Sequence, residues 1–137
     1  MEYQLNYDKL DLMREHGSPR KNNEHLFEYR DEKSMMRILE GAGADILCFG
    51  HTPKPYDRDE RPAYRQALNI GSVGKLKDGD PRACYVELDI PSNLSVFEPE
   101  ALGVNFIRVP YDVEKSARGV LDVELPACYA QALLTAH

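Results

Sequence analysis

Residues 45–51 read Asp45-Ile46-Leu47-Cys48-Phe49-Gly50-His51, and this stretch decides the fold. Its four consecutive apolar residues are typical of a short strand that is buried on both faces. Gly50 ends the strand, and His51 follows it directly. In sheets of α/β proteins, the loops at the carboxyl ends of the strands build the functional site. The stretch therefore predicts both a central strand and the position of a site.

A helix is predicted immediately before this strand. From about Glu32, apolar residues recur at helical period, at Met35, Met36, Ile38 and Leu39. Asp31 can cap the start of the helix, and Gly41 or Gly43 can end it. A helix that leads into a buried strand ending in Gly-His indicates α/β architecture.

The segments on either side are predominantly β. Residues 10–13 roughly alternate, as a half-buried strand does, and residues 15–19 break that pattern. Residues 19–30 form a polar loop with a helical turn around 24–29, and the acidic residues Asp57, Asp59 and Glu60 are interpreted as a solvated loop. Further strands are expected at 67–69, 83–88, 94–97 and 105–109. Two short helices close the chain, one from near Asp112 and one with Pro126 in its first turn, the latter with an apolar side formed by Tyr129, Ala130, Leu133 and Leu134.

The composition describes a single globular domain spanning residues 1–137. Charged residues make up 29% and hydrophobic residues 42% of the chain. The net charge of −6 argues against a protein whose main function is to bind nucleic acid. No apolar run approaches the roughly 20 residues that cross a membrane. The three cysteines, Cys48, Cys84 and Cys128, are widely spaced, which favours reduced thiols and a cytoplasmic location.

Two histidines follow predicted strands and are candidate metal ligands. His16 stands in His-Gly-Ser-Pro and His51 in Gly-His-Thr-Pro. Imidazole is the commonest side-chain metal ligand, and an adjacent glycine lets it project into a cleft. The alternative is that each ring only caps its loop by a hydrogen bond. Because both histidines have the same structural role, the two interpretations are about equally supported by the sequence.

A series of motifs in a fixed order resembles the second half of the small bacterial and archaeal calcineurin-like metallophosphoesterases. The motifs are His16-Gly17-Ser18-Pro19-Arg20, Gly50-His51-Thr52, Lys54-Pro55-Tyr56, Asn69-Ile70-Gly71-Ser72-Val73-Gly74, Asp78-Gly79-Asp80-Pro81-Arg82 and Tyr111-Asp112-Val113-Glu114. The resemblance implies part of a four-layer αββα sandwich, here mostly one β-sheet with flanking helices. The chain would be the carboxyl-terminal lobe of such a fold.

The resemblance also implies a function and a set of site residues. In this family two divalent metals activate a water that hydrolyses a phosphate mono- or diester. His16 would match the isolated histidine ligand, and His51 the first histidine of the Gly-His-x-His motif, both on one metal such as Mn, Fe, Zn or Ni. Asn69, Gly71 and Ser72 would form the loop that binds the phosphate of the substrate.

Departures from the family pattern imply that the site is incomplete. Pro53 replaces the second histidine of Gly-His-x-His, and the chain contains no Asp-x-His or Gly-Asn-His segment. No residue of this chain is therefore assigned as catalytic, and the metal is expected to be weakly held. Activity would need the missing amino-terminal lobe, from the same protein or from a separate chain. The alternative is a non-catalytic binding module that forms homo-oligomers, and nucleotide binding without hydrolysis is a third possibility that no motif supports.

Overall fold

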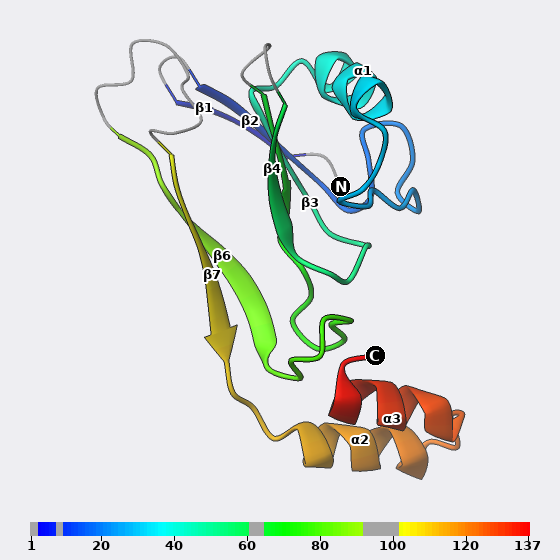
Figure 1. The fold of residues 1–137 in the computed structure, drawn as a ribbon. Coiled ribbons are helices and arrows are strands. Elements are labelled where there is room, and N and C mark those ends of the chain that lie inside the picture. Colours follow the sequence, from blue (N-terminus) through cyan, green and yellow to red (C-terminus); the bar gives the residue numbers. More distant parts are fainter. Residues whose placement is uncertain (1–2, 8–9, 61–64, 92–101) are drawn as a thin grey trace.

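The structure, a computed structural model, describes residues 3–7, 10–60, 65–91 and 102–137. Figure 1 shows two β-sheets facing one another, with one helix on the outer face of the larger sheet and a pair of helices at the far end of the chain. The larger sheet has the strand order β1 (Tyr3–Tyr7), β2 (Leu10–Glu15), β3 (Ile46–Phe49), β5 (Arg65–Asn69) and β4 (Tyr56–Glu60). The smaller sheet pairs β6 (Ala83–Asp89) with β7 (Gly103–Val109). The helices are α1 (Glu32–Ala42), α2 (Val113–Asp122) and α3 (Ala127–Thr135).

The centre of the larger sheet is parallel, and its register determines where the site lies. Strand β3 pairs in parallel with β2 on one side and with β5 on the other. Glu15 is level with Phe49, and Phe49 is level with Asn69. The residues that follow these three strand ends therefore leave the sheet at one common edge, where a functional site is expected in an α/β fold.

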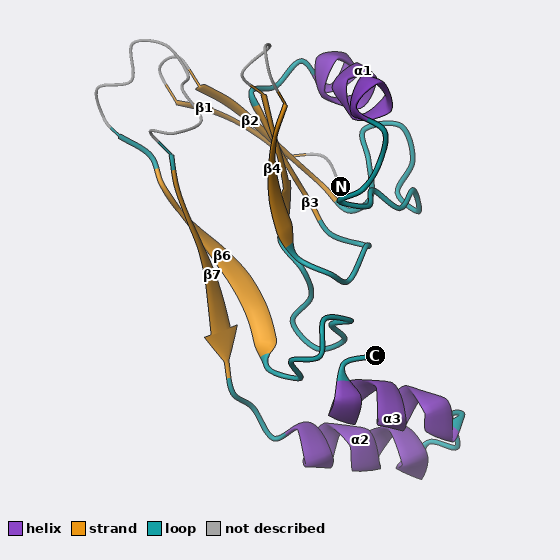
Figure 2. Cartoon of the chain, in the orientation of Figure 1, coloured by secondary structure: helices purple, strands orange, loops and turns teal. Residues whose placement is uncertain are grey.

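Strand β3 is buried on both faces, as its sequence predicts. Leu47 and Phe49 belong to the apolar core that the sheet forms with α1, together with Met35 and Leu39. Ile46 belongs to a second core on the opposite face, where partly buried side chains of β6 and β7 pack against Leu12, Cys48 and Leu68. The sheet is therefore the middle layer between α1 and the β6–β7 hairpin (Figure 2).

The pair α2 and α3 is attached at the open end of the β6–β7 hairpin, away from the larger sheet (Figure 1). Ala136 joins Leu76 and Cys84 in a small apolar cluster, and its carbonyl accepts a hydrogen bond from Gly79 N at 3.1 Å. The end of α2 and the residues between the two helices leave Leu121, Val123 and Leu125 exposed. None of the helices in the described ranges has the length and apolarity needed to cross a bilayer.

Most predicted elements are confirmed. Asp31 accepts a hydrogen bond from Ser34 N at 3.0 Å and caps α1, and Gly43 ends it in the left-handed conformation with φ of 66°. Asp112 caps α2 in the same way, by accepting from Lys115 N at 2.8 Å. Pro126 is the N-cap residue of α3, one position before its first turn. The strand expected at 94–97 lies outside the described residues.

Several sequence expectations were wrong. The acidic residues Asp57, Asp59 and Glu60 form strand β4 instead of a solvated loop, and the side chain of Glu60 is only 1% exposed. Burial raises the pKa of Asp57 and of Glu60, and Arg58 Nε lies 2.5 Å from Glu60 Oε1. In β4 the buried positions are Tyr56 and Glu60. Because one buried position is itself acidic, the sequence does not show the alternation of apolar and polar residues that is typical of a strand.

Other differences concern the loop and the two chain ends. Residues 24–27 are neither helical nor turned, and a turn follows at 28–29. Strand β1 was not anticipated, because its residues have no clear alternation and it is an edge strand. On α3, Ala130 is buried but Tyr129 and Leu134 are exposed, because the helix packs mainly against α2 and not against a sheet.

Gly17 and Gly41 provide a matched test of the loop that follows β2. A Cβ atom at Gly17 would lie 2.4 Å from the Asn22 carbonyl oxygen, whereas one at Gly41 in α1 would meet nothing within 4 Å. We predict that Gly17→Ala lowers the free energy of unfolding by about 1–3 kcal/mol through this clash. Gly41→Ala should raise it by about 0.5–1 kcal/mol, because alanine is the better helix former. Urea unfolding measures both, and equal effects would contradict the packing described for the loop.

Candidate metal centre

The two candidate histidines come together at the carboxyl edge of the larger sheet. His16 directly follows β2, and His51 follows β3 after one glycine. Gly50 N donates a hydrogen bond of 3.0 Å to the His16 carbonyl, which joins the two strand ends. His16 Nε2 then lies 3.1 Å from His51 Nδ1, with the rings in an edge-to-face arrangement at a centroid distance of 5.0 Å.

This nitrogen–nitrogen contact is compatible with two different occupants. One ring can donate a proton to the other, which makes the contact a hydrogen bond between neutral imidazoles. Two imidazoles on one tetrahedral zinc, with Zn–N distances of 2.0–2.1 Å, would place their nitrogens about 3.3 Å apart. The observed 3.1 Å is close to that value. The separation of the two nitrogens is therefore compatible with two ligands of a single cation.

The rest of a metal site is not found in the described part of the chain. In the ranges that the structure covers, no three His, Cys, Asp or Glu side chains are grouped so as to hold a metal ion. Catalytic metal sites usually have three protein ligands and an open position. Two imidazoles supply only two of the three protein ligands that such a site usually has, so a complete site would need at least one further donor group.

His51 has a strained backbone that its neighbour holds in place. Its φ of 57° is in the left-handed region, which is uncommon for a residue other than glycine. The next residue, Thr52, is buried and bonded on both sides: its hydroxyl accepts from Leu26 N at 3.0 Å, and its carbonyl accepts from Asn69 Nδ2 at 2.9 Å. Such strain persists where the surroundings over-determine the conformation, and it clusters at functional sites.

The predicted phosphate-binding residues lie at the same edge. Asn69 is fully buried, and both ends of its amide contact the backbone: Nδ2 donates to Thr52 O, and Oδ1 accepts from Gly71 N at 2.8 Å. The Asn69 amide thus connects the loop at Thr52 to the loop at Gly71. Gly71 and Ser72 line a cavity next to His51, and Ser72 Oγ accepts from Lys75 N at 3.1 Å. Direct phosphate binding by these three residues remains a prediction.

A charged network fixes the loop after His16. Glu24 accepts hydrogen bonds from Ser18 Oγ at 2.5 Å and from Arg20, and Arg30 lies 3.2 Å from its other oxygen. Burial alone would raise the pKa of Glu24, but the bonds from Arg20 and Ser18 and the nearby positive charges hold it below its ordinary value. Glu24 is therefore a structural carboxylate that sets the course of the loop.

The same loop brings a third imidazole to the site. The ring of His25 lies 4.4 Å from that of His51, between centroids, with a tilt of 35°. The position of His25 could not be predicted from the sequence, because its segment has no periodic pattern. Its neighbour Leu26 is fully buried and clamped by two hydrogen bonds, one from its N–H to Thr52 and one that its carbonyl accepts from Tyr56 Oη at 3.1 Å.

These groups surround a cavity of about 1190 Å³ between the sheet edge and the β6–β7 hairpin. Its lining includes the three histidines, the Gly71-Ser72 turn and three cationic side chains, Arg14, Lys75 and Lys77. Cys48 also reaches the cavity, and burial raises the pKa of its thiol to about 12, so the thiol stays neutral. Glu15 is the lining carboxylate. The ammonium of Lys75 lies over the Tyr129 ring of α3, at 4.6 Å from its centroid.

Comparison with solved structures identifies the fold. A hypothetical protein from Pyrococcus horikoshii matches 99% of this chain with a TM-score of 0.76 and 18% identity. A metallophosphoesterase from Sphaerobacter thermophilus matches 98% with a TM-score of 0.72 and 23% identity. A conserved protein from Streptococcus pneumoniae, described as a predicted phosphoesterase, matches 80% with a TM-score of 0.54 and 18% identity.

These matches confirm the predicted fold, which this chain shares with the solved metallophosphoesterase from Sphaerobacter thermophilus. The chain spans 50%, 57% and 56% of the lengths of the three structures. No family model matches the chain, and no curated protein matches it by sequence.

The contacts of Glu24 predict that its contribution to the free energy of unfolding is lost at acidic pH. Because the folded-state pKa is lowered, the contribution of Glu24 is fully present above its ordinary pKa of 4.5 and is lost as the pH falls through the lowered value. We expect Glu24→Gln to cost roughly 1–2 kcal/mol at pH 7 and much less at pH 3. Glu28→Gln, an exposed carboxylate 3.7 Å from Lys54, should change stability by less than about 0.5 kcal/mol. Urea unfolding at both pH values tests this, and equal stability of wild type and Glu24→Gln at pH 7 would contradict it.

Proposed function

We propose that this chain, which has a calcineurin-like metallophosphoesterase fold, is the carboxyl-terminal lobe of a metal-dependent phosphoesterase acting on phosphate mono- or diesters. The observation that supports the proposal most directly is the 3.1 Å contact of His16 Nε2 with His51 Nδ1 at the carboxyl edge of the parallel strands. The proposal is also supported by the solved structures of similar fold, which include a metallophosphoesterase and a predicted phosphoesterase.

In this function His16 and His51 are the ligands that the chain contributes to one divalent cation, such as Mn, Fe, Zn or Ni. When bound, such a cation binds phosphoryl oxygens and lowers the pKa of a coordinated water. The chain's own residues attract and orient the substrate. The cavity lining includes the cationic residues Lys75, Lys77 and Arg14, and cationic side chains favour an anionic phosphate ester over a neutral ligand. The rigid Gly71-Ser72 turn forms one wall of the space that the phosphate would occupy.

The lobe needs further metal ligands to become a hydrolase. Two imidazoles bind a cation more weakly than three ligands do, and Pro53 stands where the family has a second histidine in the loop. The missing donors would come from an amino-terminal lobe, in the same protein or in another chain.

A second function is favoured by the helix pair. The segment from α2 to α3 exposes Leu121, Val123, Leu125, Tyr129 and Leu134. Clusters of exposed apolar side chains mark interaction surfaces. A non-catalytic module that assembles through α2 and α3 would retain the fold without a complete metal site.

Metal binding by histidine variants tests the first function. Wild-type chain should bind one Zn²⁺ or Mn²⁺ per molecule in isothermal titration calorimetry. His16→Ala and His51→Ala should each weaken binding by at least about tenfold, because one of two ligands is lost. His137→Ala, an exposed histidine at the far end of the chain, is the control and should bind like wild type. Unchanged binding in both site variants would refute the proposed centre.

Association in solution tests the second function. A module that assembles through the helix pair should show a mass in light scattering that increases with protein concentration. Val123→Asp, at a side chain that is 65% exposed, should return it to a monomer without loss of folding. Lys115→Asp on α2 is the control for added negative charge. A wild-type chain that stays monomeric at all concentrations would exclude this function.

A further inference from the structure

One face of the His51 ring is covered by a row of aromatic rings. They belong to His25, Phe27 and Tyr29, which we call the ring stack. The ring of His25 lies 4.4 Å from that of His51, between centroids, with a tilt of 35°. Phe27 follows at 5.5 Å and 14° from His25, and Tyr29 at 5.2 Å and 9° from Phe27. Rings at these distances and angles are in offset stacking. The four rings therefore form one column that begins at His51.

A hydrogen bond between two loops holds this column together. Leu26 is fully buried in the core, whereas the residues on either side of it, His25 and Phe27, are exposed. Leu26 N donates to Thr52 Oγ1 at 3.0 Å. The two bonded residues are the sequence neighbours of His25 and His51, so the bond fixes the distance between the backbones that carry these two rings. The contact of His25 with His51 is thus a consequence of how the loop is anchored.

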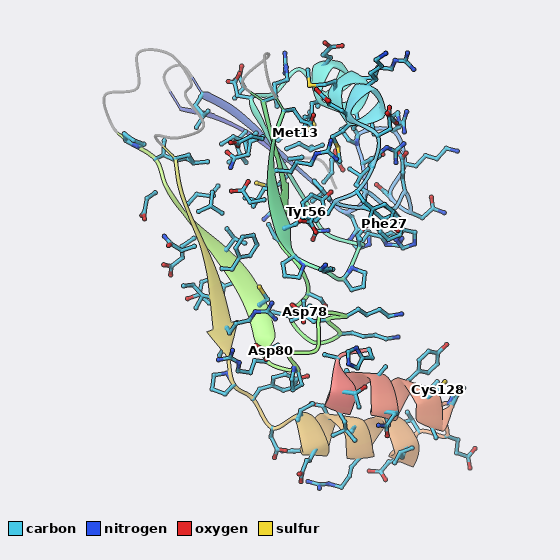
Figure 3. All side chains as sticks on the ribbon, viewed as in Figure 1. Met13, Phe27, Tyr56, Asp78, Asp80 and Cys128 are labelled. Atoms are coloured by element: carbon cyan, nitrogen blue, oxygen red, sulfur yellow. The ribbon has the colours of Figure 1, made fainter. Side chains whose placement is uncertain are left out.

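Packing of the core does not account for the outer rings of the ring stack. Phe27 is 40% exposed and Tyr29 is 83% exposed. Figure 3 shows Phe27 on the side of the larger sheet away from β6 and β7. The loop beneath these rings is nevertheless held in place, because Arg58 of β4 donates to the carbonyls of Glu28 and Arg30 at 2.8 and 2.6 Å. The outer rings therefore support His25 from a fixed backbone.

The ring of His51 needs such support if it is to bind a cation. Rotation about the bond to a histidine ring has only broad preferences, so the backbone alone does not set the plane of the ring. A metal-binding histidine is usually oriented by a hydrogen bond from its second nitrogen to a carboxylate, a carbonyl or water. Within the ranges that the structure describes, the His51 ring has one hydrogen bond to another residue, and it joins Nδ1 to His16. A cation between the two imidazoles would replace that bond.

We propose that the ring stack is a positioning device that fixes the plane of the His51 ring, so that Nδ1 stays directed toward the cation position beside His16. The inference rests on the proposed function and assigns to its metal centre residues that are not ligands. His25 covers the face of His51 and limits its rotation, and Phe27 supports His25 from the other side. The ring stack takes the place of the hydrogen bond that usually orients a metal-binding imidazole.

The geometry distinguishes this role from that of a third ligand. The rings of His25 and His51 lie one over the other, so they touch through their faces. Across the ranges that the structure covers, His25 does not belong to any group of three His, Cys, Asp or Glu side chains that could hold a metal ion. His25 thus acts through the plane of its ring, and a ring without nitrogens should serve equally well.

Zinc binding by two variants of His25 separates the plane of its ring from its nitrogens. His25→Phe keeps a ring over His51 and removes both nitrogens, whereas His25→Ala removes the ring. In isothermal titration calorimetry with Zn²⁺, we expect His25→Phe to bind like wild type and His25→Ala to bind roughly tenfold more weakly, a loss typical of a residue that orients a ligand. In the His51→Ala background, His25→Ala should cause no further loss, because it acts through His51. His25 is exposed, so neither change removes core packing.

The motion of the His51 ring gives a second readout that needs no metal. Carbon-13 relaxation of the ring Cε1–H bond in the metal-free chain yields the order parameter of that bond. The order parameter should fall in His25→Ala, stay near the wild-type value in His25→Phe, and fall by a smaller amount in Phe27→Leu. Tyr85→Leu, at a ring that is 43% exposed and outside the ring stack, is the matched control for Phe27→Leu and should change neither the order parameter nor the zinc affinity.

The two readouts decide this inference separately from the proposed function. Equal loss of zinc affinity in His25→Phe and His25→Ala would overturn the inference, because a nitrogen of His25 would then be the group required. An order parameter or a zinc affinity that is unchanged in His25→Ala would overturn it as well. A wild-type chain that binds no Zn²⁺ would refute the proposed function, and the relaxation data would still decide whether the ring stack fixes the ring of His51.

Discussion

The parallel pairing of β3 with β2 and β5 is the constraint on which the rest of the structure depends. It aligns Glu15, Phe49 and Asn69 at one level, so three loops leave the sheet side by side. The bond from Gly50 N to the His16 carbonyl extends this pairing past the last strand residues. A slip of one residue would turn the side chains of β3 to the wrong faces, and the two imidazoles would no longer meet. The site is thus a consequence of burying Leu47 and Phe49 against α1.

Hydrogen bonds of buried polar groups hold the aligned loops in fixed positions. Thr52 and Asn69 are buried, and each connects two segments: Thr52 accepts bonds from Leu26 N and Asn69 Nδ2, and Asn69 also accepts one from Gly71 N. Unpaired buried polar groups are costly, so each loop is held in the position that satisfies them. This rigidity explains how His51 keeps a positive φ.

Sequence reasoning was strongest where a local pattern determined the outcome. The apolar run of β3, the Asp31 and Gly43 ends of α1 and the positions of His16 and His51 after strands are local signals, and the structure contains each element. It failed where long-range contacts decide. Strand β4 was missed because it forms by pairing with β5, where Gln66 donates a hydrogen bond to Asp57. His25 was not placed at the site because two contacts distant in sequence bring it there: Leu26 N donates to Thr52 Oγ1, and Leu26 O accepts from Tyr56 Oη.

The most direct measurement of the central claim is an anomalous difference map from crystals of this chain grown with Zn²⁺. The account predicts one peak within bonding distance of both His16 Nε2 and His51 Nδ1, at the edge shared by β2 and β3. A map with no peak there, or with zinc bound only at other residues while the two rings keep their hydrogen bond, would contradict it.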